Sequence, residues 1–148
     1  MKHWTTETTG RVVFLRLDKG EDLLEGIQAA LREHQLRDGM VISGIATVSH
    51  CRLHQVQGTD YPAVDKILEL DGPLEVMNIS GISADGALHL HATVADQNGR
   101  AYGGHVEPGC TVLYLAEIAV LEAPDAKMTR ERSEHGIFQL VGGDGNIS

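Results

Sequence analysis

The sequence has few aromatic residues: three Tyr, two Phe and one Trp among 148. Its core must therefore rest on aliphatic side chains, and the apolar content of 42% is ordinary for a globular chain. No apolar stretch approaches the roughly eighteen residues that span a bilayer. The opening MKHWTTETTG lacks the apolar core of a secretory signal. We therefore expect a soluble, cytoplasmic protein with no membrane association.

Cysteine is also scarce. Cys51 and Cys110 are far apart in the sequence and form no Cys-x-x-Cys pair. In a chain without a secretory signal, this usage is typical of reduced thiols rather than of a disulfide framework. The expectation is two reduced, buried thiols.

Basic residues are outnumbered, with 12 Lys and Arg against 21 Asp and Glu and a formal net charge of −9. The densest basic region, around 130–132, is interrupted by Glu131. Binding to a phosphate backbone needs clustered cations. The charge therefore argues against direct nucleic-acid binding.

Several enzyme motifs are missing. The chain has no G-x-S-x-G nucleophile elbow, no P-loop and no dinucleotide fingerprint. A serine hydrolase, a P-loop NTPase and a Rossmann oxidoreductase therefore have no support in the sequence.

The length predicts one domain, residues 1–148. Residues 11–18 alternate and predict a strand, whereas the apolar spacing in 19–39 predicts one long helix. From residue 40 onwards, short apolar runs are separated by turn signals, read at 71–73, 85–86, 98–99 and 108–109. The pattern indicates an α+β fold: a mainly antiparallel β-sheet with one long helix packed on it. Residues 123–148 read as a polar extension with a flexible end.

Three histidines stand out in LHLHATVADQNGRAYGGH, residues 88–105. Side chains alternate along a strand, so His89 and His91 lie on one face, opposite the leucines between and beside them. If the following hairpin has an odd-numbered loop, His105 lies directly opposite His91, and with an even loop it is still adjacent. All three imidazoles can then converge on one point.

Three neutral imidazoles are ligands for a divalent metal, with zinc the first choice and Fe²⁺, Mn²⁺ and Ni²⁺ also suited. Three protein ligands leave a coordination position open, as in catalytic rather than structural zinc sites. The alternative is that His89, His91 and His105 are merely solvated surface histidines. The predicted hairpin favours the metal site.

Two further groups of polar residues are weaker candidates for a functional site. Glu75 lies in an otherwise apolar segment, LEVMNI, and is either exposed at an edge or turned toward the histidines, where it would be a general base or an extra ligand. His50 and His54 share strand parity with Arg52, and we interpret them as a solvated edge.

The segments RLDKGEDLLEGI, VISGIATVSHCRL, PLEVMNISGIS, LHLHATVADQNGRAYGGHVEPGC and AEIAVLE occur in this order. In that order they resemble the plant-and-prokaryote conserved (PPC) domain over about 11–122. RERSEHGIFQL resembles the family's short C-terminal extension. The resemblance implies an α+β fold, with one helix against an antiparallel sheet, assembled as a homotrimer.

In plants this domain is joined to AT-hooks and directs their choice of protein partners, and stand-alone prokaryotic members are named as candidate DNA-binding proteins. Neither Gly10-Arg11 nor Gly99-Arg100 lies in an AT-hook core. Some prokaryotic members carry zinc on a His-x-His…Gly-Gly-His pattern, which maps onto His89, His91 and His105. Acetolactate decarboxylase, a metal-dependent lyase, has a similar fold and histidine arrangement.

Three hypotheses follow. The first is a trimeric metal-binding protein with a DNA-associated or regulatory role through partners. The second is a small metal-dependent, lyase-like enzyme that polarises a carbonyl at the three-histidine site. The third is a purely structural trimerisation module.

Overall fold

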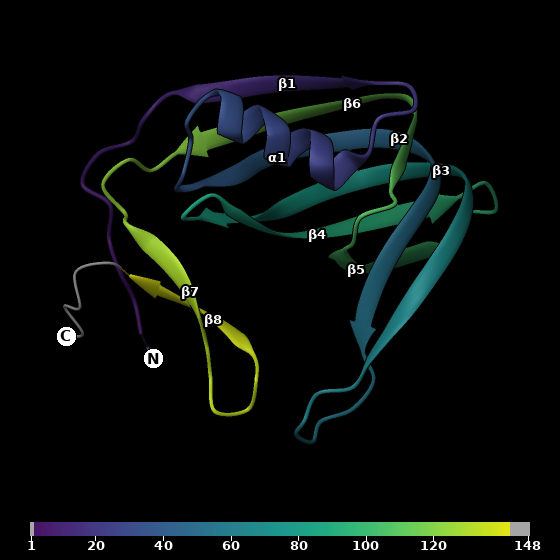
Figure 1. The fold of residues 1–148 in the computed structure, drawn as a ribbon. Coiled ribbons are helices and arrows are strands. Elements are labelled where there is room, and N and C mark those ends of the chain that lie inside the picture. The colour runs from purple at the N-terminus through teal and green to yellow at the C-terminus, as the bar shows by residue number, and fades with distance from the viewer. Residues whose placement is uncertain (1, 143–148) are drawn as a thin grey trace.

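The computed structural model describes residues 2–142, which form two separate sheets and a helix (Figure 1). The elements are β1 (Val12–Asp18), α1 (Leu23–Glu33), β2 (Gly39–Val56), β3 (Asp65–Ala84), β4 (Ala87–Asp96), β5 (Ala101–Val106), β6 (Thr111–Glu122), β7 (Met128–Arg132) and β8 (Phe138–Gly142). The larger sheet has the order β1-β6-β2-β3-β4-β5, and β7 and β8 form a hairpin of their own. All neighbours are antiparallel, so the predicted α+β class with a mainly antiparallel sheet is confirmed.

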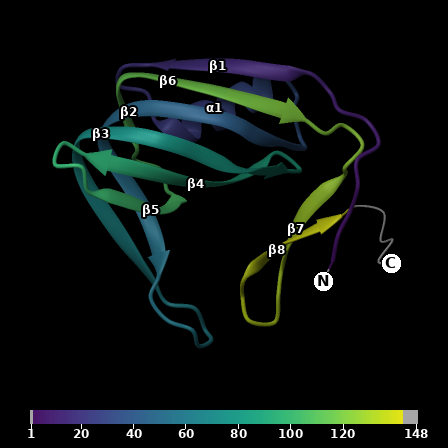
Figure 2. The same cartoon turned by 180° about the vertical axis from the view of Figure 1, so that it is seen from behind.

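The larger sheet closes on itself because β2 is long. The first part of β2 pairs with β6, whereas Leu53 and His54 near its end pair with β5. The pairing register shifts between Val48 and His50, and irregularities of this kind bend a strand and increase its twist. Figures 1 and 2 show β2 and β3 curving away from the β1–β6 layer. Strands β2, β3, β4 and β5 therefore form a ring in which β5 contacts two partners.

The helix packs against the sheet through one apolar stripe. Asp22 is its N-cap and accepts a hydrogen bond of 2.9 Å from the Glu25 amide, and Leu23, Ile27 and Leu31 are buried. One helix packed on the sheet is confirmed, but the prediction that it is long is wrong, because α1 has 11 residues. In residues 2–142 no helix is both long and apolar enough to cross a membrane.

One predicted turn is wrong. The segment 71–73 lies inside β3, which is a single strand. Gly72 is close to the neighbouring strand instead: a Cβ built on it would lie 2.5 Å from the Val48 carbonyl oxygen. Glycine is therefore required there for the close approach of two backbones rather than for reversing the chain. By contrast, the turns at 85–86 and 98–99 are confirmed.

The C-terminal extension has more structure than its composition indicates. Its described part contains the β7–β8 hairpin, and the predicted flexible end, 143–148, lies outside the described residues. The His135 ring beside the hairpin's turn stacks on Tyr61, with ring centroids 4.1 Å apart. This contact joins the hairpin to the loop between β2 and β3.

Candidate metal centre

The β4–β5 hairpin sets the relative positions of the three predicted ligands. The Asp96 amide donates a hydrogen bond of 2.9 Å to the Arg100 carbonyl, so three residues form the loop. This odd-numbered loop places His91 directly opposite His105. His89 follows at the next position on the same face of β4. The structure thus has the first of the two registers that the sequence allows.

The three imidazoles converge. The Nε2 atoms of His89 and His91 are 3.1 Å apart, and the His105 ring meets both rings edge-on, with centroid distances of 4.7 and 5.5 Å. One ring nitrogen from each histidine lies within 4.8 Å of the other two. Tetrahedral zinc with Zn–N bonds of about 2.0–2.1 Å separates its nitrogen ligands by about 3.3 Å. The three rings therefore offer donor atoms that could hold one small divalent ion.

His105 also belongs to a second group of candidate donor atoms. His54 on β2 pairs with His105 across the β2–β5 contact, and their rings stack with centroids 4.5 Å apart. His54 Nδ1 is 2.6 Å from Glu107 Oε1, and because an ionised carboxylate only accepts, the imidazole donates. His54, His105 and Glu107 form a second set that could hold a metal ion. The cluster therefore has five members, and His105 is shared by both sets.

Sequence reasoning missed two of these residues. We interpreted His54 as a solvated edge and did not consider Glu107. Glu107 follows His105 by two positions, so the alternation rule alone could have placed both on one face. His54 is brought in by the β2–β5 pairing, which joins strands far apart in the sequence.

Glu75 is not brought to the histidines. It is exposed on β3 opposite Ala95, which is four residues from His91 along β4, or roughly 13 Å. It lines a separate hollow of about 150 Å³ that it shares with Thr47 and Tyr114. Glu75 belongs to neither set of candidate ligands.

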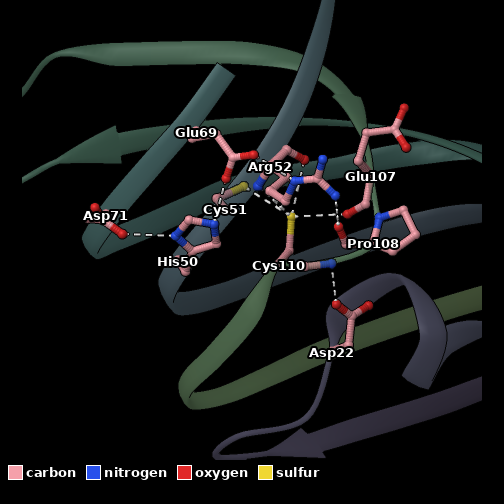
Figure 3. A network of polar contacts seen from close by, with 10 residues as sticks. Asp22, His50, Cys51, Arg52, Glu69, Asp71, Glu107, Pro108 and Cys110 are labelled. Carbon is pink, nitrogen blue, oxygen red and sulfur yellow. Dashed lines mark hydrogen bonds and ion pairs between the residues drawn. The ribbon is translucent and has the colours of Figure 1, made fainter. Parts of the chain in front are cut away.

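His50 and Arg52 form a network that does not include the three histidines (Figure 3). His50 contacts Asp71 through Nδ1 at 2.9 Å and Glu69 through Nε2 at 3.0 Å, and Arg52 Nε donates to Glu69 at 2.9 Å. The Asp71 carboxylate is the main cause that raises the pKa of His50. Both nitrogens of His50 are occupied, so this residue is an ion-pair partner of β3.

The two thiols lie beside this network and are buried and free, as expected. Their Sγ atoms are 3.2 Å apart, and the Arg52 amide donates to Cys110 Sγ at 3.2 Å. The hydrogen bond with Cys110, followed by burial, raises the pKa of Cys51. Within residues 2–142, neither thiol belongs to a set of candidate metal ligands.

The surroundings of two of these histidines, His89 and His105, favour the neutral imidazole by lowering its pKa. Burial, and then the neighbouring His54 and His89, lower the pKa of His105 from 6.5 to about 4. Burial is also the largest cause of the lowered pKa of His89, followed by the charge of Arg130. A metal ion requires the neutral imidazole. His89 and His105 are thus in the metal-binding form at neutral pH.

This lowered pKa predicts how stability depends on pH. Between pH 6.5 and about 4 the unfolded chain binds a proton at His105 that the folded chain does not bind, so the free energy of unfolding of the metal-free protein should fall as the pH falls through this window. Urea unfolding at pH 7.0, 5.5 and 4.5 measures this free energy of unfolding. The His105→Asn variant, whose side chain cannot titrate, should lose less free energy of unfolding over the same pH range. An equal loss in both proteins would contradict the assignment.

The fold and the cluster together define a class of protein. Its members are small α+β domains in which a closed antiparallel sheet carries a cluster of histidines that is a candidate metal centre. The sequence profile of the Plants and Prokaryotes Conserved (PCC) domain matches residues 5–124. The chain belongs to this family, as the resemblance had indicated.

The chain is also similar in sequence or in structure to several individual proteins. The bifunctional protein GlmU of two Synechococcus strains is 33% identical over 117 and 122 residues, and the matched region spans 79% and 82% of this chain but 18% of each relative. A metal-containing protein from Archaeoglobus fulgidus is 28% identical, with a TM-score of 0.80 over 95% of this chain and 99% of the other. A protein from Bacteroides thetaiotaomicron, named as a candidate DNA-binding protein, shares the fold at 17% identity, with a TM-score of 0.79 over 93% and 96% of the two chains.

Proposed function

We propose that this chain is a metal-binding PPC-domain protein, which binds one divalent ion, zinc first, through His89, His91 and His105. The observation that carries the proposal is the convergence of one nitrogen from each ring within 4.8 Å. The metal content named for the Archaeoglobus relative supports it, because that protein matches this chain over nearly its whole length.

The surrounding residues suit such a site. Glu107 accepts a hydrogen bond from His54, whose ring packs on His105, and partners of this kind fix the orientation of a metal ligand. When bound, the ion would supply a Lewis acid that polarises a carbonyl or activates water. Partial burial of His89 and His105 limits competition from solvent.

We further propose that the protein is a homotrimer, as its family resemblance implies. An exposed apolar surface on strands β1, β2 and β6 supports this assembly. Phe14 on β1 and Ile45 on β2 line one hollow and are 81% and 49% exposed, and Tyr114 on β6 is 68% exposed. Exposed side chains of this size, adjacent on one face, are typical of surfaces that associate with another protein. A second copy of the chain is the partner that we propose.

A role in DNA-associated regulation would then depend on protein partners. The Bacteroides protein's name supports a link to DNA. The charge of −9 opposes direct contact with phosphates, and residues 1–148 contain no AT-hook. We therefore propose that any DNA association is indirect.

Three measurements on untagged protein test this function. Elemental analysis should find about one zinc per chain, and sedimentation should find a trimer. A random DNA duplex at low salt should not shift in a gel. Protein without metal would leave the structural trimerisation module as the better hypothesis, whereas a salt-sensitive shift would show that the chain contacts DNA itself.

A small metal-dependent enzyme is the second candidate, and the His54–Glu107 pair favours it. An imidazole hydrogen-bonded to a carboxylate is a common general base, and this one packs on a proposed metal ligand. In the enzyme hypothesis, His54 accepts or releases a proton at Nε2, and Glu107 fixes the tautomer of His54 through its hydrogen bond to Nδ1. Glu75, the base predicted from the sequence, is too distant for this role.

A further inference from the structure

Cys51 and Cys110 face each other across two neighbouring segments of the sheet. His50 on β2 pairs with Thr111 on β6, and the next residues of this antiparallel register are Cys51 and Cys110. Opposed residues of an antiparallel pair have Cα atoms about 4.5–5.5 Å apart, within the range of about 4.4–6.8 Å that a disulfide bridges. Because the two Sγ atoms are 3.2 Å apart, the side chains are placed to form that bond.

The surroundings of the pair make Cys110 the sulfur that reacts first. The Arg52 amide donates to Cys110 Sγ at 3.2 Å, and the hydrogen bond with Cys51 is the largest cause that lowers the pKa of Cys110. The thiolate is the reactive form of a cysteine. The pKa of Cys51 is raised instead, so Cys51 stays a thiol beside it. A reactive cysteine next to a second thiol is the arrangement of redox-sensitive pairs.

The turn before Cys110 determines how an oxidant reaches it. Both thiols are buried, but Cys110 directly follows a turn whose Pro108 is exposed (Figure 3). A terminal nitrogen of Arg52 donates to the Pro108 carbonyl at 2.9 Å, and Asp22 accepts from the Gly109 amide at 2.6 Å. Turns held by a few contacts open locally at a lower free energy than paired core strands do. Opening of this turn is therefore the route to the buried sulfur.

We propose that Cys51 and Cys110 form a reversible disulfide when the protein meets hydrogen peroxide. The Cys110 thiolate attacks one peroxide oxygen, the O–O bond breaks, Cys110 becomes a sulfenic acid, and the leaving hydroxide takes up the proton that Cys110 lost. The Cys51 thiol then attacks the Cys110 sulfur, the S–O bond breaks, and water leaves with the Cys51 proton. The two thiols are oxidised by two electrons, and one peroxide is reduced to two water molecules.

The disulfide would close a loop that contains the candidate metal centre. Residues 51–110 include β3, β4 and β5, and with them His89, His91 and His105. Closing a loop restricts the unfolded chain, so the oxidised protein should be the more stable form. The inference does not depend on a bound metal, since among the described residues neither sulfur belongs to a set of candidate ligands.

The test exposes the metal-free full chain to hydrogen peroxide. Free thiols are counted in denaturant, and a peptide map without reductant shows which cysteines are joined. Cys51→Ser and Cys110→Ser are the variants that cannot form the bond. Arg52→Gln removes the side chain that fastens the turn, and Arg16→Gln, an exposed arginine on β1 that is also in an ion pair, is its matched control.

We expect wild type to lose both thiols together and to yield joined peptides containing Cys51 and Cys110. Its Tm should rise by about 10 °C, and dithiothreitol should restore both thiols and the original Tm. Neither serine variant should show joined peptides within one chain or the rise in Tm. Arg52→Gln should be oxidised roughly tenfold faster than wild type, because a hydrogen bond from a charged donor is lost, and Arg16→Gln at the wild-type rate.

A wild-type chain that keeps both thiols in peroxide would overturn the inference. Oxidation of each thiol separately to sulfinic acid, or a disulfide only between two chains, would overturn it as well. Equal oxidation rates in wild type and Arg52→Gln would show that the turn at Pro108 is not the route to Cys110.

Discussion

His105→Ala should lower the affinity for Zn²⁺ at least about 100-fold, and more than His91→Ala does. Loss of a residue that only supports a ligand already costs 10–100-fold, and His105 is itself a proposed ligand. It also belongs to both sets of candidate donors. Without His91, the set of His54, His105 and Glu107 remains, whereas without His105 no set of three is left. Competition with a chromophoric chelator measures both affinities.

The matched control is His3→Ala, which removes an exposed histidine outside the cluster and should leave the affinity unchanged. Circular dichroism of the metal-free variants checks that each is folded. If His105→Ala and His3→Ala bind Zn²⁺ equally well, the ion is held elsewhere and the ligand assignment is wrong.

Gly81→Ala should lower the free energy of unfolding by roughly 3 kcal/mol, with a drop in Tm of about 6–12 °C. A Cβ at this position would lie 2.0 Å from the His89 carbonyl oxygen, far inside van der Waals contact, and that oxygen belongs to backbone that cannot rotate away. Strands β3 and β4 would have to separate beneath the candidate metal centre. Thermal unfolding followed by circular dichroism measures the change.

Gly58→Ala is the control for this substitution, because a Cβ there has nothing within 4 Å. It should leave Tm nearly unchanged. If Gly81→Ala were as stable as Gly58→Ala, the close approach of Gly81 to the His89 carbonyl would be wrong. Metal affinity of Gly81→Ala should also fall, since His89 moves with its carbonyl.

Local sequence signals predicted the features that depend on neighbouring residues. The turn at 98–99 and the alternation around His89 and His91 lie in one hairpin, so a single loop length determines whether His105 faces them. The same kind of reasoning failed at 71–73. Glycine and proline there were read as a turn, but the close approach to Val48 on another strand is what requires the glycine.

The remaining site residues depend on contacts that no local pattern encodes. His54 reaches His105 only because β2 bends at 48–50 and pairs with β5. The sequence could therefore predict three donors on one ribbon, but it could not predict the pairing of β2 with β5 that adds His54.

The most direct test of the central claim is an anomalous difference map, measured at the zinc edge from crystals of untagged protein. The account predicts a single peak, with ring nitrogens of His89, His91 and His105 each at about 2.0–2.1 Å. A map without a peak at these rings, or an ion coordinated by other residues while the three imidazoles point apart, would contradict it.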